Sequence, residues 1–170
     1  MSDVEYNPFQ ETLAPTPARL LPWTTVLAGS LVTIVPLGAT LPLLPPFGLL
    51  MLLAWRLLAP LSMRIWAPAL LGFFDDLVSG QPMGSAVLLW SGAFFLVEAI
   101  EQRAVVRGFG HDWLIAAFAI ALCLVAGRFI AVPFGAHVDT VLLLQVVLSI
   151  LAFPLCASLV GFLDRKRGRI

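Results

Sequence analysis

Long apolar runs divided by short turns constrain this chain more than any other feature of its sequence. Hydrophobic residues make up 60% of the 170 residues and charged residues only 12%. This composition is typical of polytopic membrane proteins rather than of water-soluble cores. The length of the runs favours helices, and the pattern predicts an all-α integral membrane protein.

Six apolar segments are predicted to be helices of one transmembrane bundle. Their expected ranges are 19–44, 47–59, 65–79, 82–100, 113–134 and 138–163. Pro22 suits a helix start, whereas Pro36 and Pro42 should kink or end the first helix. The second segment is short, because a helix needs about 20 residues to cross the bilayer core. It must therefore recruit flanking residues or tilt against its neighbours.

The distribution of arginines predicts that both termini lie in the cytoplasm. In that orientation only Arg128 lies toward the outside, which satisfies the positive-inside rule. The other arginines considered are Arg19, Arg64, Arg103, Arg107 and the basic cluster at 165–169. Trp23, Trp66 and Trp113 are expected near the cytoplasmic boundary. We expect a flexible cytoplasmic tail over 1–18, a transmembrane domain over 19–164 and a basic cytoplasmic tail over 165–170.

Two adjacent carboxylates, Asp75 and Asp76, lie within the third apolar segment. A carboxylate at the centre of a membrane helix costs roughly 2.5–3.5 kcal/mol on insertion scales, so each needs a partner, water or a nearby interface. Arg56 lies inside the second segment, at a depth that an antiparallel neighbour would share with Asp76. We predict an Arg56–Asp76 ion pair, with Arg128 as the competing partner. A pair that only fixes helix packing is favoured over a transport or proton-relay role.

The sequence gives little support for catalysis or metal binding. Magnesium-diphosphate sites use further carboxylates at helical spacing, but apolar residues follow the two aspartates. An intramembrane aspartyl protease needs a second aspartate on another helix, and the other carboxylates all fall near predicted helix ends. They are Glu98, Glu101, Asp112 and Asp139. His111 and His137 stand alone, and Cys123 and Cys156 form no paired motif. We expect no catalytic residue, metal or cofactor, and no enzyme activity.

A short motif follows the start of the third segment. The residues that define it are Gly72, Asp76, Gly80, Pro82 and Gly84. The three glycines form a small-residue pattern that lets helices approach closely. With six short helices and a basic tail, the motif resembles the rod shape-determining protein MreD family. Asp76 matches the family's usual acidic position, and Asp75 looks like an addition.

The resemblance implies a non-enzymatic inner-membrane component of the bacterial cell-elongation (rod) complex, which guides lateral peptidoglycan synthesis and cell shape. It implies four protein partners: MreC, which would bind through its membrane anchor, the MreB filament, RodA and a penicillin-binding transpeptidase. It also implies contact with membrane lipids and no binding of nucleic acid. The fold is expected to be similar to the substrate-binding subunits of energy-coupling-factor transporters. The alternative function is therefore a small-molecule-binding or transport subunit. An enclosed pocket with convergent polar groups would favour that alternative.

Overall fold

The computed structural model describes residues 16–32, 44–80, 82–103, 108–131 and 140–167, and all regular structure in these ranges is helical. The α-helices are α1 (Thr16–Val32), α3 (Phe47–Leu58), α4 (Ala67–Ser79), α5 (Ser85–Glu101), α6 (Phe109–Ala131) and α7 (Thr140–Arg167). One 3-10 turn, η1 (Pro60–Ser62), lies between α3 and α4. The predicted all-α class is confirmed, and each predicted segment overlaps one α-helix.

The helix boundaries differ from the prediction mainly at the two ends of the chain. Helix α1 begins at Thr16 rather than near Arg19, and Pro22 lies inside it instead of at its start. Helix α7 continues to Arg167, so most of the expected basic tail is helical. Some predicted features lie outside the described residues: Pro36, Pro42, Arg107, His137, Asp139, the 1–15 part of the N-terminal tail and residues 168–170.

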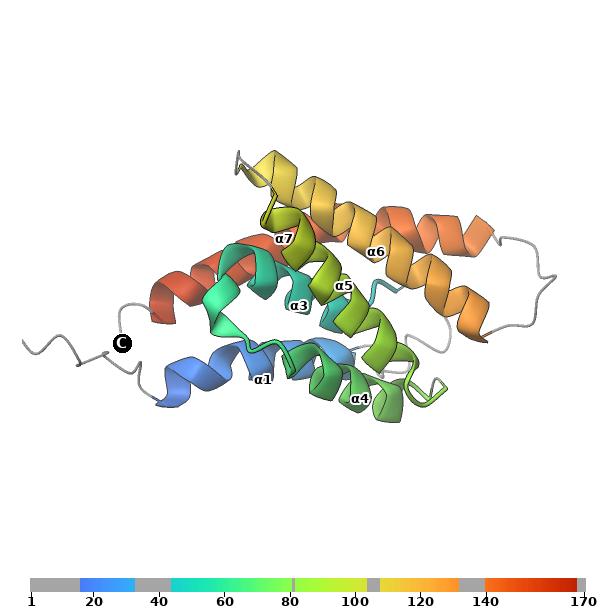
Figure 1. Ribbon diagram of the computed structural model, residues 1–170, viewed down its shortest axis with the longest axis horizontal. Coiled ribbons are helices and arrows are strands. Elements are labelled where there is room, and N and C mark those ends of the chain that lie inside the picture. The colour runs from blue at the N-terminus through green and yellow to red at the C-terminus, as the bar shows by residue number, and fades with distance from the viewer. Residues whose placement is uncertain (1–15, 33–43, 81, 104–107, 132–139, 168–170) are drawn as a thin grey trace, which may run out of the picture.

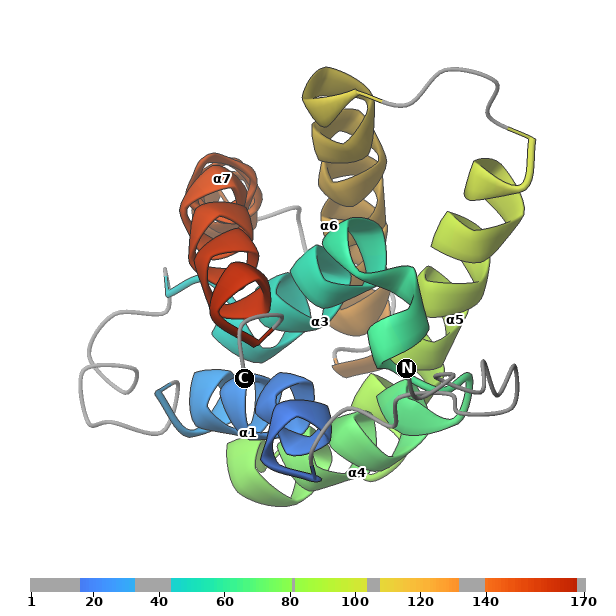
Figure 2. The ribbon, with the colours of Figure 1, turned by 90° about the vertical axis from the view of Figure 1, so that its left-hand side faces the viewer.

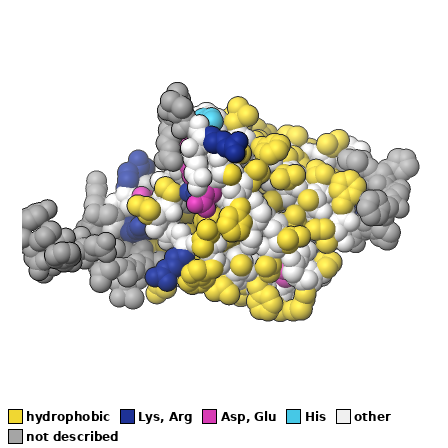
Figure 3. Space-filling model, in the orientation of Figure 1, with side chains coloured by type: hydrophobic (Ala, Val, Ile, Leu, Met, Phe, Trp, Pro, Cys, Tyr) yellow, Lys and Arg dark blue, Asp and Glu magenta, His cyan; other side chains and the backbone are white. Residues whose placement is uncertain are grey.

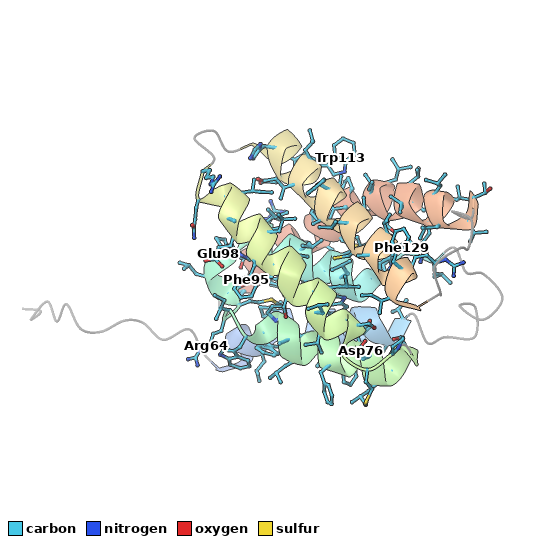
Figure 4. The ribbon with its side chains drawn as sticks, turned by 45° about the vertical axis from the view of Figure 1, so that its right-hand side comes forward. Arg64, Asp76, Phe95, Glu98, Trp113 and Phe129 are labelled. Carbon is cyan, nitrogen blue, oxygen red and sulfur yellow. The ribbon has the colours of Figure 1, made fainter. Side chains whose placement is uncertain are left out.

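Successive helices run in alternating directions along one bundle (Figure 1). Helix α1 begins and α7 ends at the same end of the molecule, where α4 and α6 also begin. We call this the Arg64 end, and the opposite end, where α4 meets α5, the Asp76 end. Figure 4 shows Arg64 and Asp76 at these opposite ends. Because of this alternation, helices that are far apart in the sequence have ends on the same side of the bundle, where their residues can make contact.

Helix α3 occupies the centre of the bundle. Figure 2, viewed from the Arg64 end, shows α1, α5, α6 and α7 around it, and α3 packs against all four. Its side chains Leu50, Leu52 and Leu53 are fully buried, and the Trp55 indole N–H donates to the Thr25 hydroxyl of α1 at 2.8 Å. A helix of 12 residues is only about 18 Å long. The short segment is accommodated because protein, rather than lipid, surrounds it.

The outer surface of the bundle is apolar. Among the described residues, two helical spans are long and apolar enough to cross a membrane, Phe109–Ile130 in α6 and Thr140–Arg167 in α7. Only 28% of the most apolar part of each is buried. Figure 3 shows hydrophobic side chains over most of one face, with Lys, Arg and His side chains gathered at its left. Soluble proteins rarely expose apolar surface this extensive. An apolar outer surface of this kind is typical of helices that pack in lipid.

Candidate functional site

The motif between Gly72 and Gly84 folds as the hairpin that joins α4 to α5. Helix α4 ends at Ser79, and Gly80 follows in the left-handed conformation with φ = 67°. Gly84, with φ = 94°, precedes the first residue of α5. Residues other than glycine adopt such φ values at a cost, so both glycines are required by the turn itself. The expectation that they serve close helix approach is wrong, since a Cβ at either would meet nothing within 4 Å.

Gly72 does serve close approach. A Cβ at this position would lie 2.7 Å from the backbone carbonyl oxygen of Ala86 on α5. Any side chain would therefore push the two helices apart. The small-residue prediction is confirmed at this one position of the motif.

Asp76 caps the N-terminus of α5 from the neighbouring helix. Its carboxylate accepts hydrogen bonds from the Gly84 N–H at 2.8 Å, the Ser85 hydroxyl at 2.9 Å and the Ala86 N–H at 2.8 Å. A helix start leaves backbone N–H groups without partners inside the helix, and the preceding residue usually supplies an oxygen for them. Gly84 has no side chain with which to do so. Asp76 takes over that task from eight residues upstream.

The Asp76 cap explains how a charged group tolerates burial here. The residue is only 2% exposed, and a buried carboxylate without partners would be costly. Both carboxylate oxygens accept hydrogen bonds, and the positive end of the α5 dipole lies beside them. The negative charge is therefore stabilised by backbone groups rather than by a cation.

Arg56 pairs with Glu101 and not with Asp76. Its Nη1 lies 2.9 Å from Oε2 of Glu101, and the two side chains are 8% and 9% exposed. The guanidinium also stacks over the ring of Phe94, 5.0 Å from its centroid. The predicted Arg56–Asp76 pair is thus wrong. Within the described part of the chain, the hydrogen bonds to Asp76 come from groups at the start of α5.

Helix length is the physical reason for the error. The prediction assumed that Arg56 and Asp76 share a depth, because each lies a similar distance along its segment when the two are counted from opposite faces. Helices α3 and α4 have only 12 and 13 residues. Each residue therefore lies close to the C-terminal end of its own helix, and in antiparallel neighbours those ends are opposite. Helices α3 and α5 run parallel, so Arg56 instead meets the end of α5, where Glu101 lies.

Asp75 and Arg128 line a shared pocket at the Asp76 end. The pocket is partly open, has a volume of about 230 Å³ and is enclosed by α3, α4, α5, α6 and α7. Gln145 is its third strongly polar residue, and the amide N–H of Gln145 donates to the Leu44 carbonyl at 3.0 Å. The Asp75 carboxylate also faces the hydroxyl of Ser30 on α1. An acid, a guanidinium and an amide therefore converge on one small space.

The remaining polar candidates do not form a reactive group. Within the described ranges no cluster of three or more His, Cys, Asp or Glu side chains could hold a metal ion. Cys123 and Cys156 are separate buried thiols, and His111 is exposed near the start of α6. Trp23 and Trp66 pack against each other with their rings tilted by 45° and the ring centroids 5.3 Å apart. Trp113 lies near the start of α6 and donates to the carbonyl oxygen of Ile150 at 3.1 Å.

Sequence reasoning missed the role of Glu101 and the grouping around the pocket. Glu101 was set aside because it falls near a helix end, although Arg56 falls near the end of a parallel helix on the same side. Ser85 carried no signal of its own, whereas Gln145 stood out only as one of the few polar side chains within the apolar segments. The short spacing between Asp76 and Gly84 across a Gly/Pro turn was the available clue to the cap.

A helical bundle with an apolar surface and two described helices long enough to cross a membrane is typical of a membrane protein. Within that class, the family model described as rod shape-determining protein MreD matches residues 18–163. The chain belongs to this family, and membership implies a membrane-associated role in determining rod shape. Comparison with curated proteins and with solved structures gave no match.

Proposed function

We propose that this chain is a non-enzymatic, multi-pass inner-membrane component of the cell-elongation complex, which supports lateral peptidoglycan synthesis by binding partner helices. The family match over residues 18–163 carries the proposal. The apolar outer faces of α6 and α7 support it, because they offer long surfaces for helix packing in lipid. MreC, through its membrane anchor, is the proposed direct partner. The MreB filament, RodA and a penicillin-binding transpeptidase belong to the same proposed assembly.

The buried charges support a structural rather than a catalytic role. Arg56 and Glu101 pair with each other, and Asp76 is held by the first turn of α5. Charged groups that are paired or hydrogen-bonded in this way stabilise the packing of the helices. Clean turnover of a substrate by the purified protein would contradict the proposal.

The proposed orientation has both termini in the cytoplasm and the Arg64 end at the cytoplasmic face. Most described basic side chains lie at that end: Arg64, Arg103, Arg165, Lys166 and Arg167. Arg128 lies toward the Asp76 end. An excess of Lys and Arg on one side is the usual mark of the cytoplasmic side.

Cysteine accessibility at the two ends of α5 tests the orientation. Met83 and Gln102 are both exposed and flank the two ends of α5. In intact cells stripped of their outer membrane, an impermeant thiol reagent should label Met83→Cys and spare Gln102→Cys. The wild-type chain is the control, because its two cysteines are buried. The reverse labelling pattern would overturn the proposed orientation.

Co-purification tests the partner. The full chain, extracted in mild detergent, should retain tagged MreC. A version of MreC whose anchor is replaced by an unrelated single span of equal length is the matched control and should be lost. Equal retention of both versions would show that the membrane anchor is not the contact.

The pocket at the Asp76 end favours a second candidate function, small-molecule binding. Its three polar residues converge as such a site requires, although its volume of about 230 Å³ is below the roughly 300–1,000 Å³ typical of ligand pockets. The small volume favours a small polar group over a bulky transport substrate.

A further inference from the structure

The pocket that contains Asp75, Arg128 and Gln145 brings three polar side chains together within the apolar bundle. Its walls are largely apolar and include Leu49 and Leu124, yet it also presents one carboxylate and one guanidinium, each half-buried. Charged groups within a membrane protein face a cavity or a partner and mark functional sites. Asp75 is also separate from the Asp76 cap, whose hydrogen bonds use the neighbouring carboxylate. The pocket is therefore not explained by the packing of the α4–α5 hairpin.

The balance of charge in the pocket selects a class of ligand. An anion would be attracted by Arg128 and repelled by Asp75, and a cation would meet the opposite pair of forces. A zwitterion places each of its charges against its complement. The Gln145 side-chain N–H donates to the Leu44 carbonyl. The amide oxygen of Gln145 can accept a hydrogen bond from an ammonium group.

The depth of the pocket matches the headgroup region of a bilayer. Asp75 lies four residues before the end of α4, about 6 Å along the axis. Arg128 lies three residues before the end of α6, about 4.5 Å, and Gln145 lies five residues after the start of α7, about 7.5 Å. Figure 4 shows Phe129, the neighbour of Arg128, toward the same end of the bundle as Asp76. These polar groups thus lie within one or two turns of the helix ends.

The size of the pocket also suits a headgroup. A volume of about 230 Å³ lies below the roughly 300–1,000 Å³ of typical ligand pockets. It therefore suits a compact polar headgroup better than an acyl chain. The exposed apolar side chains Phe129, Leu143 and Leu144, on α6 and α7 near this end, offer a surface for the chains outside it.

We propose that this pocket binds a small zwitterion that carries a phosphate and a primary ammonium, with the phosphate at Arg128 and the ammonium at Asp75 and Gln145. A phosphatidylethanolamine headgroup and a free phosphoethanolamine share this chemistry. The site is independent of the proposed contact with MreC.

Native mass spectrometry of the full chain, released from nanodiscs, tests the site. The probes are phosphatidylethanolamine and phosphatidylglycerol with identical acyl chains, and the wild-type protein should retain the ethanolamine lipid preferentially. Arg128→Gln and Asp75→Asn should each lower that retention about tenfold, the effect of losing one charge-assisted hydrogen bond. Arg64→Gln, an exposed arginine at the opposite end, is the matched control and should leave retention unchanged.

A volume-filling variant guards against loss of folding in the charge variants. Leu124→Trp occupies the pocket without changing its charge and should also lower retention of the ethanolamine lipid. Equal retention of both lipids by the wild-type protein, or unchanged retention in Leu124→Trp and both charge variants, would overturn the site. Thermal stabilisation by soluble O-phosphoethanolamine that is lost in Arg128→Gln would support the site and identify a free zwitterion as a ligand. Retention of the lipid without that stabilisation would support it and identify the lipid as the source.

Discussion

The two ends of the bundle bury charge in different ways. At the Arg64 end, Arg56 of α3 and Glu101 of α5 neutralise each other across 45 residues of sequence. At the Asp76 end, Asp76 is satisfied by backbone and hydroxyl groups only eight to ten residues away. The first solution needs two helices that are not neighbours in sequence to be correctly packed, whereas the second is contained within one hairpin. Long-range and local stabilisation are therefore separated along the bundle axis.

Breaking the Arg56–Glu101 pair should have the largest effect. Arg56→Leu leaves Glu101 buried without its cation, and removing one member of a buried pair costs about 3–5 kcal/mol in soluble proteins. The free energy of unfolding in mixed micelles should fall by about 3 kcal/mol, since the survivor can draw in some water. The double variant Arg56→Leu/Glu101→Leu should recover most of the loss. A double variant no more stable than Arg56→Leu would show that the pairing contributes nothing.

Removing the charge of the Asp76 cap should have the next largest effect. Asp76→Asn replaces one acceptor oxygen by an amide nitrogen that faces backbone N–H donors, and the free energy of unfolding should fall by about 2 kcal/mol. Asp75→Asn is the adjacent control and should be milder, because Asp75 makes none of the bonds to the start of α5. An equal loss in both variants would contradict the assignment of the cap to Asp76.

Crowding the α4–α5 contact should cost somewhat less. Gly72→Ala places a methyl group 2.7 Å from the Ala86 carbonyl oxygen, and such overpacking typically costs about 1–3 kcal/mol. Gly92→Ala on α5 is the matched control, because its Cβ would meet nothing within 4 Å. Alanine there should be neutral or stabilising by up to about 1 kcal/mol, the difference in helix propensity. The melting temperature of Gly72→Ala should therefore fall, whereas that of Gly92→Ala should stay unchanged or rise.

Substitution of Gly80 in the α4–α5 turn should lower the free energy of unfolding least. Gly80→Ala forces an alanine into φ = 67°, which costs about 1 kcal/mol. Gly80→Asn should cost less, because asparagine tolerates the left-handed region better than alanine. Chemical denaturation of the pair resolves this order. Alanine and asparagine variants of equal stability would mean that the turn does not retain its left-handed residue.

The sequence was sufficient to predict the helices and insufficient to predict their contacts. Apolar runs bounded by Pro and Gly gave the six segments, because hydrophobicity and helix breaking are local properties. The family motif pointed to Asp76 and its glycines correctly. Their tasks were not evident, since capping by a residue on the previous helix depends on how the hairpin closes.

The partner of Arg56 could not be found from depth alone. A depth estimate assumes that each segment is long enough to span the bilayer, whereas α3 has only 12 residues. The pocket was equally hidden, since Asp75, Arg128 and Gln145 come from three helices and meet only in the tertiary structure. Tertiary placement of short helices is the information that the sequence lacks.

A pair of double-mutant cycles tests the separation of the two ends most directly. The free energy of unfolding in mixed micelles would be measured for Arg56→Leu combined with Glu101→Leu, and for Arg56→Leu combined with Asp76→Asn. Contacting residues couple, whereas distant sites add within about 0.3–0.5 kcal/mol. The structure predicts a coupling of about 2 kcal/mol or more in the first cycle and additivity in the second. Strong coupling between Arg56 and Asp76, with none between Arg56 and Glu101, would contradict it.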